Sequence, residues 1–353
     1  MVFQILIAHL REILANEQLV LDIIKEELLE IKQKYGDERK TKIVAAEGEI
    51  NVEDLIKEEQ TVVALTHFGY IKRMPIDTYR SQKRGGKGIT GISTREEDFV
   101  KQIFTASTHD TILFFSNKGK LYRLRGYEIP EAGRTAKGTA IVNLLRLDNG
   151  EKISAVIPIT NFEDGKYLLM ATKNGLIKKT ALKDFDSTRK TGLLSITLKD
   201  DDELIDVRLT DGEDNVVLVT SKGLSITFDE KDVRPVGRSA QGVIGIRLDD
   251  KDFVIGMESI IASKDATLLA ITEHGFGKRT ELSEYRVQNR GGRGVITYKV
   301  TPKTGNIVGI RIANGDEDVM MITDKGTIIR LKVEEISILG RATQGVTLMR
   351  TND

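Results

Sequence analysis

One pattern recurs six times along this 353-residue chain and constrains its fold more than any other feature. Each copy has four consecutive apolar residues, a threonine or serine, and a turn that ends in glycine. The apolar runs are Val62–Leu65, Ile112–Phe115, Leu168–Ala171, Val216–Val219, Leu268–Ile271 and Val319–Ile322. The turn glycines are Gly69, Gly119, Gly175, Gly223, Gly275 and Gly326. Successive turn glycines are 48 to 56 residues apart, so the chain is built from repeats.

The repeats predict an all-β fold. A short apolar run beside a turn is typical of a strand that is buried on both faces, and glycine supplies the positive φ that a tight hairpin needs. Periods near 50 residues with several strands each are typical of propeller blades. A ring of blades also protects the strand edges, because each blade covers its neighbour. We therefore expect a six-bladed β-propeller, or β-pinwheel, over residues 61–353.

The first 60 residues have a different character. Apolar residues such as Ile13, Leu21 and Leu28 recur at three- and four-residue steps over residues 4–34, which predicts one amphipathic α-helix. Gly36 is a plausible end for it. Residues 37–60 are acidic and polar, as in a linker. The expected organisation is a helical part over 1–36, an acidic linker over 37–60 and the pinwheel over 61–353.

A second motif ends each repeat in a glycine. These glycines are Gly88, Gly138, Gly192, Gly242, Gly294 and Gly345. In five repeats the glycine follows Arg, two small residues and then Lys, Arg or Gln, whereas the third repeat has Thr188–Thr191 in that place. We call residues 84–88, 134–138, 188–192, 238–242, 290–294 and 341–345 the first to sixth closing loops.

The closing loops have the composition of a phosphate site. Small residues let the backbone approach a ligand, and Arg and Lys add charge-assisted hydrogen bonds. A single copy taken alone fits a tight turn with solvated charges better than a phosphate site. The first copy, Gln82–Gly88, holds three basic residues and three glycines in seven positions, which is more than a turn requires and favours phosphate binding.

Charge is segregated along the chain, although the formal net charge is zero. Residues 1–60 hold 8 Lys and Arg against 14 Asp and Glu, so the remainder holds 45 against 39. Residues 61–95 hold seven basic residues and one acid, Asp77, while the connector Asp200–Glu203 is acidic. We expect a basic rim, and salt-sensitive binding to duplex DNA with little sequence preference. The few aromatic residues disfavour recognition of single strands or RNA.

Several other chemistries are excluded by composition and spacing. The chain has no Cys, which excludes disulfides and thiolate metal sites and suits a reducing cytoplasm. Its histidines lack metal-ligand spacing. The chain contains neither the Gly-x4-Gly-Lys-Ser/Thr loop of nucleotide-hydrolysing enzymes nor a serine nucleophile elbow. The apolar start of the chain lacks the features of a signal peptide or a membrane span. We expect no metal, cofactor or membrane partner.

Gln82–Gly88 closely resembles the box motif of the C-terminal domain of the bacterial DNA gyrase A subunit. The six repeats are similar to that domain's pinwheel, and Ile23–Val44 resembles the segment that leads out of the breakage-reunion core. The resemblance implies that duplex DNA wraps around the rim so that gyrase introduces negative supercoils. It also implies two partners, the breakage-reunion core and the gyrase B subunit, in the cytoplasm at the nucleoid. Because the core's tyrosine nucleophile lies elsewhere, we expect no catalysis from this chain alone, and ATP and Mg²⁺ would act in other parts of the enzyme.

The candidate DNA contacts are the basic residues of the repeats together with the first motif. They are Gln82, Lys83, Arg84, Gly85, Gly86, Lys87, Gly88, Lys72, Arg73, Arg134, Lys137, Arg189, Lys190, Arg238, Arg290, Arg293 and Arg341. Two alternatives stay open. One is the equivalent A-type C-terminal domain of topoisomerase IV, which the intact motif argues against. The other is a propeller that serves as a protein-interaction scaffold.

Overall fold

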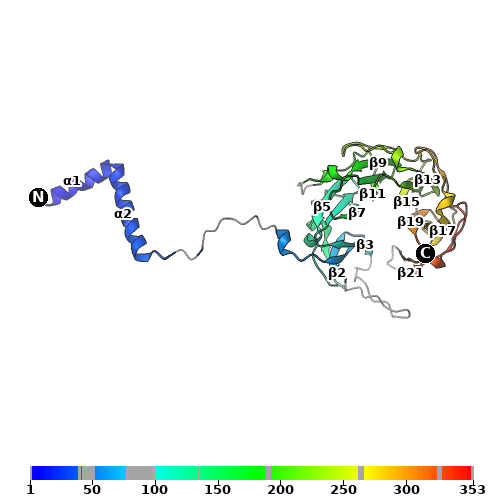
Figure 1. Ribbon diagram of the computed structural model, residues 1–353, viewed down its shortest axis with the longest axis horizontal. Helices are drawn as coiled ribbons and strands as arrows, with labels where there is room; N and C mark the ends of the chain where they lie inside the picture. Colours follow the sequence, from blue (N-terminus) through cyan, green and yellow to red (C-terminus); the bar gives the residue numbers. More distant parts are fainter. Residues whose placement is uncertain are drawn as a thin grey trace. The chain divides into compact units, whose positions relative to one another are not determined.

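The structure is a computed structural model that describes residues 2–38, 41, 52–76, 98, 100–133, 135–187, 192–260, 266–323 and 328–350 (Figure 1). The chain divides into two compact units, Met1–Val52 and Glu53–Asp353. The first unit contains the two α-helices and the second contains all the strands. None of the helices in the described ranges is long and apolar enough to cross a membrane.

The N-terminal unit has two helices where one was predicted. Helix α1 (Val2–Ala15) and helix α2 (Glu17–Tyr35) are separated by Asn16, whose backbone is extended at φ −125° and ψ 103°. The Asn16 side chain accepts a hydrogen bond from the Gln18 N–H at 3.0 Å. The sequence periodicity continues through this point, but asparagine favours the N-cap position, so a new helix begins there. Neither helix has a buried residue.

In the second unit each of the first five repeats forms a hairpin followed by a third strand. These strands are β1 (Gln60–Thr66), β2 (Tyr70–Pro75) and β3 (Val100–Ser107); β4 (Thr111–Ser116), β5 (Lys120–Arg125) and β7 (Ile153–Ile159); β8 (Tyr167–Thr172), β9 (Leu176–Ala181) and β11 (Leu204–Thr210); β12 (Asn215–Thr220), β13 (Leu224–Asp229) and β15 (Val254–Ile260); and β16 (Thr267–Thr272), β17 (Phe276–Glu281) and β19 (Ile307–Ala313). The apolar run is the first strand of each hairpin, as the pattern predicts.

Each of these blades takes its fourth strand from the following repeat. The exchanged strands are β6 (Thr139–Ala140), β10 (Leu193–Leu194), β14 (Val243–Ile244), β18 (Val295–Ile296) and β22 (Val346–Thr347). In the third blade, for example, the order is β11-β8-β9-β14, and Val243 pairs with Ile177. Neighbouring repeats are therefore tied together by backbone hydrogen bonds as well as by packing.

The prediction of six blades is not matched by the structure, because the described residues form five four-stranded blades. In the sixth repeat the described residues form a two-stranded sheet of β20 (Asp318–Ile322) and β21 (Ile328–Lys332). In each of the five complete blades a later repeat supplies the outer strand.

The core lies between the blades. Val216 and Leu218 of β12 pack in a cluster with Leu169 of the third blade. The alternating residues Val217 and Val219 pack in another cluster with residues of the fifth blade. All four residues of this run are fully buried, because successive side chains of a strand point to opposite faces. The prediction of strands buried on both faces is confirmed in this blade.

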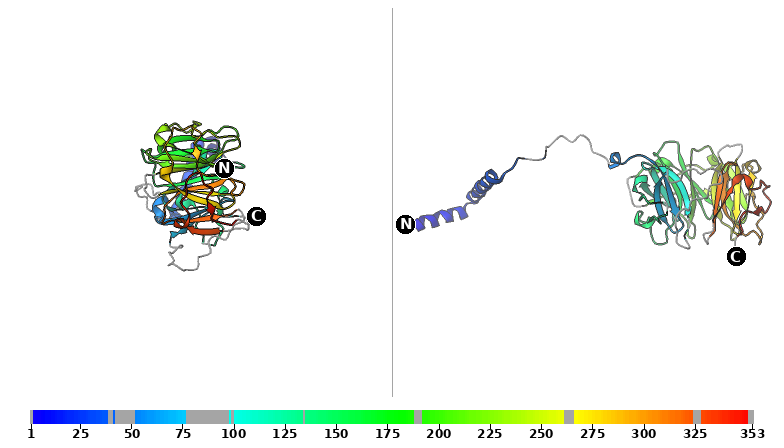
Figure 2. Two further views of the ribbon diagram at one scale, coloured as in Figure 1. Left: turned by 90° about the vertical axis from the view of Figure 1, so that its right-hand side faces the viewer. Right: turned by 90° about the horizontal axis from the view of Figure 1, so that it is seen from below.

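The third strands lie at the centre of the blade array. Strand β11 packs against β7 and β15, and β15 packs against β19. In Figure 1 these strands lie inside the arc of blades, with β5, β9, β13 and β17 outside them, and Figure 2 shows the same blades from two other sides. The short exchanged strands pair with those outer strands. Each blade therefore runs from its third strand at the centre to its exchanged strand at the outer edge.

Candidate nucleic-acid interface

The closing loops lie at the outer edges of the blades. Each described closing loop ends directly before an exchanged strand, as Gly242 does before β14 and Gly294 before β18. Since the exchanged strand is the outermost strand of its blade, the loop preceding it lies at the rim. The repeat thus places one arginine-containing loop at the edge of one blade after another.

The last glycine of the motif is required by the backbone. Gly294 has φ +77°, and a methyl group at its Cα would lie 2.3 Å from the carbonyl oxygen of Ser225 in β13. Gly242 has φ +90° and would clash in the same way with Ile177 of β9. The glycine allows the closing loop to turn tightly onto the strand beside it, which explains its place in the second, fourth, fifth and sixth repeats, where its φ is positive.

Successive closing loops are bonded to one another. The Arg247 N–H donates to Gly292 O at 2.8 Å, so the segment after the fourth loop meets the fifth. The Lys299 N–H likewise donates to Thr343 O at 3.0 Å, which joins the fifth loop to the sixth. From the fourth loop to the sixth, these bonds make a backbone-bonded series along the rim rather than independent turns.

Arginines of the fifth and sixth loops reinforce this series. Arg290 donates from Nε to Asp232 O at 2.9 Å and from its terminal nitrogen to Ile244 O at 3.1 Å. Arg341 donates to Ile296 O at 3.4 Å. Both acceptors, Ile244 and Ile296, follow the preceding closing loop. These two arginines therefore have structural partners, although both side chains also reach the surface.

Lys72 and Arg73 were predicted to contact DNA, but neither side chain lies on the open surface. Lys72 is 1% exposed, and its Nζ donates to Ala136 O at 2.8 Å. The Arg73 Nε donates to Ile129 O at 2.8 Å, and a terminal nitrogen lies 3.2 Å from a carboxylate oxygen of Glu131. Successive side chains of β2 point to opposite faces. Lys72 and Arg73 therefore contact different segments of the second repeat, around Ala136 and Ile129 respectively. Burial removes Lys72 from the candidate DNA contacts.

Other predicted residues are at the rim with different degrees of exposure. Arg293 of the fifth loop is exposed, and Arg238 of the fourth is half-buried. Lys137 is half-buried, with its Nζ 3.7 Å from the ring centroid of Tyr70, which is a cation–π contact. Gln82–Gly88, Arg134, Arg189 and Lys190 lie outside the described residues.

A family comparison agrees with this architecture. The family described as "DNA gyrase C-terminal domain, beta-propeller" matches the chain in six segments, which are residues 60–107, 110–160, 166–211, 214–261, 266–314 and 317–353. This chain belongs to the DNA gyrase A C-terminal domain family. The six matched segments confirm the six repeats and the resemblance on which the expectation of a gyrase-type pinwheel was based.

Relatives of this gyrase domain extend over its whole length. The DNA gyrase A protein of Clostridium acetobutylicum is 55% identical over 346 residues, which cover 98% of this chain and 41% of that protein. The DNA gyrase A protein of Staphylococcus epidermidis is 48% identical over 349 residues, covering 98% of this chain and 39% of that protein. The chain thus spans about two fifths of the length of the curated relatives it matches.

Two solved structures resemble the gyrase domain equally well. The C-terminal domain of DNA topoisomerase IV has a TM-score of 0.70 at 30% identity and covers 84% of this chain and 90% of its own. A DNA gyrase A C-terminal domain has a TM-score of 0.70 at 28% identity and covers 84% of this chain and 97% of its own. Backbone shape does not separate the two enzymes, so the sequence relatives decide in favour of gyrase.

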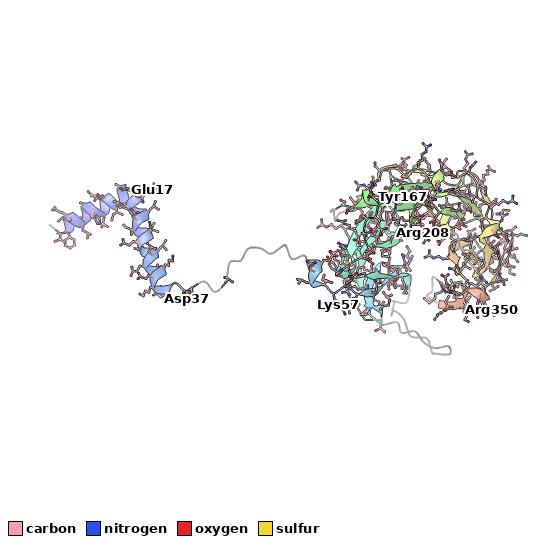
Figure 3. All side chains as sticks on the ribbon, in the orientation of Figure 1. Glu17, Asp37, Lys57, Tyr167, Arg208 and Arg350 are labelled. Carbon is pink, nitrogen blue, oxygen red and sulfur yellow. The ribbon has the colours of Figure 1, made fainter. Side chains whose placement is uncertain are left out.

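The structure also places exposed cations at the rim that are not part of the sequence motif. Arg247, Lys299 and Arg350 each lie five residues after the glycine of their closing loop, and all three are exposed. The backbone N–H of the first two makes the bonds between loops, and Figure 3 labels Arg350. Their constant spacing is present in the sequence, but the motif is defined by the residues before the glycine.

Charge at the centre of the blades is balanced rather than basic. The inner strands line a cavity of about 480 Å³, and Arg208, labelled in Figure 3, lies among them. Arg208 is 2.9 Å from Glu258, which also pairs with Arg311 at 3.0 Å. Burial raises the pKa of Glu258 and of the neighbouring Asp206, against the lowering effect of Arg208. These ion pairs join the third, fourth and fifth blades and are a structural network.

Proposed function

We propose that this gyrase domain binds duplex DNA along the rim of its blades and wraps it, so that DNA gyrase can introduce negative supercoils. The observation that carries the proposal is the bonded series of closing loops, one at the outer edge of each blade. Exposed cations such as Arg247, Arg293 and Lys299 accompany the series. Such a row of loops and cations suits the regular spacing of phosphates along a DNA strand.

Several loops must act together for wrapping. Bending a site of about 20–30 bp by about 40–90° costs roughly 1–6 kcal/mol, which one phosphate-binding loop cannot offset. A row of similar loops adds contacts in proportion to the length of DNA that is bent. This is a physical reason for repeating one supersecondary unit. The breakage-reunion core and the gyrase B subunit would use the wrapped DNA, with ATP and Mg²⁺ acting there, in the cytoplasm at the nucleoid.

Two other functions fit the observations less well. A topoisomerase IV domain shares the backbone, but the 55% and 48% identical relatives are gyrase proteins. A protein-interaction scaffold would not require a basic closing loop in successive repeats. DNA affinity separates the scaffold from the other two, and wrapping activity separates gyrase from topoisomerase IV.

Binding can be tested by gel-shift titration of a duplex of mixed sequence at two salt concentrations. We expect sequence-tolerant binding that weakens steeply with salt, because log K falls by about 0.9 for each neutralised phosphate per decade of salt. Absence of retardation at low salt would refute the proposal.

Wrapping can be tested by sealing nicked plasmid in the presence of the protein and measuring the linking number. We expect a shift that Arg84→Ala combined with Lys87→Ala reduces, because the first closing loop combines Gly-Gly with flanking basic residues. Lys183→Ala combined with Lys231→Ala is the matched control, since both lysines are exposed, pair with carboxylates and are not part of a closing loop. An equal effect of the two double variants would mean that total charge matters and the loop does not.

A further inference from the structure

A pair of cations recurs on the second hairpin strand of alternate repeats. The pairs are Lys72-Arg73, Lys178-Lys179 and Lys278-Arg279, in the first, third and fifth repeats. They occupy the third and fourth positions after the turn glycine. The three lysines at the first place of the pair are 1%, 0% and 1% exposed. A buried ammonium is costly unless it is well hydrogen-bonded, so its repetition calls for an explanation.

The first lysine of each pair binds one backbone carbonyl within the closing loop of the next repeat and a second carbonyl outside that loop. Lys178 Nζ donates to Ser195 O at 2.6 Å and to Arg238 O at 2.5 Å. Lys178 belongs to the third repeat but contacts the fourth closing loop. The reason is that β14, the strand after that loop, pairs with β9 of the third blade.

The other two lysines repeat the contact. Lys278 Nζ donates to Gly340 O at 2.7 Å and, in the sixth loop, to Arg341 O at 2.6 Å. Lys72 Nζ donates to Gly133 O at 3.0 Å and, in the second loop, to Ala136 O at 2.8 Å. Three closing loops thus have the same ammonium beneath them.

We propose that Lys72, Lys178 and Lys278 are positioning residues that hold the second, fourth and sixth closing loops in a shape that binds DNA phosphate. The inference rests on the proposed function and adds to it a set of buried residues that never touch DNA. The lysines act by fixing the direction of peptide groups in the loops and by placing positive charge beneath them.

The direction of the peptide groups follows from their planarity. In a trans peptide the N–H points away from the C=O of the same unit. A carbonyl turned inward to the ammonium therefore turns the N–H of the next residue outward. This applies to Lys137, Ser239 and Ala342, each of which follows a carbonyl bound by a lysine. Outward N–H groups beside a cation form an anion-binding surface.

The sixth loop shows that such an N–H binds an anionic oxygen. In the peptide unit between Gly340 and Arg341, the Gly340 carbonyl accepts a hydrogen bond from Lys278. The Arg341 N–H of the same peptide unit donates to Glu284 Oε2 at 3.1 Å. The same carboxylate oxygen lies 3.8 Å from the Arg341 Nε. A side-chain carboxylate therefore occupies a position with the geometry that a phosphate oxygen needs.

Loops without a lysine beneath them differ in sequence. The fifth loop lies over Ile226, and it has glycine at the two small positions, with a methyl group on Gly292 placed 3.5 Å from the Ile226 side chain. The third loop lies over Tyr122 and departs from the motif. The second, fourth and sixth loops keep Thr-Ala, Ser-Ala and Ala-Thr at the small positions. The lysine thus accompanies the loops that have Ala, Ser or Thr at the small positions.

The second cation of each pair serves as an internal control. Lys179 donates to Glu230 O at 3.0 Å, and the Arg279 Nε donates to Ile336 O at 2.8 Å. These acceptors belong to the 3-10 turns of the next repeat, Glu230–Asp232 and Val333–Glu335, or adjoin them. Lys179 is buried like Lys178 but does not bind the closing loop, so a substitution there tests repeat docking alone.

The experiment compares Lys178→Met combined with Lys278→Met against the wild-type chain in the gel-shift and ligation assays. We expect the linking-number shift per bound protein to fall about threefold to tenfold, because the fourth and sixth loops lose the hydrogen bonds that hold their carbonyls. Binding should weaken less. Lys183→Met combined with Lys231→Met removes the same charge from the surface and should leave both readouts near the wild-type values.

Three outcomes separate the possibilities. An unchanged linking-number shift in a folded Lys178→Met, Lys278→Met variant would overturn the positioning role while leaving the proposed function intact. Absence of wrapping in the wild type would refute the proposed function itself. A loss of wrapping in Lys179→Met equal to that in Lys178→Met, at equal melting temperature, would show that repeat docking is responsible and would also overturn the role. If methionine prevents folding, Lys178→Gln keeps an N–H donor group without the charge and should wrap at an intermediate level.

Discussion

The fourth and fifth closing loops occupy equivalent places and are held in different ways. The fourth has Ser-Ala before Gln241 and rests on the Lys178 ammonium. The fifth has Gly-Gly before Arg293, rests on Ile226, and is tied to the fourth by Arg290. One loop is shaped by a buried charge and the other by close backbone packing. The same turn can therefore carry different surface charge, and the contribution of each loop to DNA binding need not be equal.

The largest effect expected from this comparison is on stability. Gly294→Ala should lower the free energy of unfolding by about 2 kcal/mol or more, since left-handed backbone costs a non-glycine residue about 1–3 kcal/mol and the added methyl would overlap Ser225 O at 2.3 Å. Gly292→Ala should change it little, because the nearest atom to its methyl would be 3.5 Å away. Urea denaturation of both variants measures the difference. Equal stabilities would contradict the backbone requirement.

Arg290→Ala should have the next largest effect. The side chain makes two bonds to backbone carbonyls at 2.9 and 3.1 Å, and bonds of this kind in a half-exposed place are worth about 1 kcal/mol. Arg238→Ala should cost less stability, because Lys178 binds the Arg238 carbonyl, which the substitution keeps. Thermal unfolding of the two variants checks the order. A larger loss in Arg238→Ala would mean that the arginine, and not the lysine, holds the fourth loop.

A reciprocal exchange tests surface charge. Arg293→Gln should make the slope of log K against log salt shallower by about 0.9, and Gln241→Arg should steepen it by about 0.9, since each step corresponds to one phosphate. Both positions are exposed, so stability should stay within about 0.5 kcal/mol. Gel-shift titrations over a salt series give the slopes. Unchanged slopes would place DNA away from these two loops.

Much of the fold was predictable because the repeats are strict. The apolar run and the turn glycine predicted the hairpins, whereas the exchange of a strand between neighbouring repeats was not predicted. The five-blade count was not predictable, since a run such as Val319–Ile322 matches the others in sequence while the described residues place it in a two-stranded sheet. Burial of a strand depends on what later repeats place beside it. The helix break at Asn16 was missed because periodicity outweighed one capping residue.

The candidate site was predictable in its loops and not in its individual cations. A lysine in a basic segment is ordinarily a surface charge, yet Lys72 is 1% exposed because its strand position faces the next repeat. Arg247 and Lys299 were missed because they follow the loop. Sequence spacing locates a loop, but strand alternation decides which of two adjacent cations points outward, inward or toward a neighbour.

The smallest expected effect is a pH dependence that distinguishes the fourth closing loop from the fifth. Burial lowers the pKa of Lys178 and of Lys278 to about 8, from an ordinary value of 10.5. Arg238 also lowers the pKa of Lys178 while Asp184 raises it, and for Lys278 the corresponding groups are Arg341 and Glu284. Between pH 8 and 10.5 the unfolded chain binds more protons at these sites than the folded chain does. Their contribution to stability therefore rises with pH in that window.

DNA wrapping should change in the opposite direction. Above pH 8 the ammonium groups beneath the fourth and sixth loops lose charge and one donor hydrogen, whereas Ile226 beneath the fifth does not titrate. The linking-number shift should therefore decline modestly from pH 7 to pH 9. Over the same range, the contribution of these lysines to the free energy of unfolding should not decrease. The Lys178→Met, Lys278→Met variant should lack that part of the decline. An identical pH profile in wild type and variant would show that the fourth loop, like the fifth, does not depend on a buried charge for wrapping.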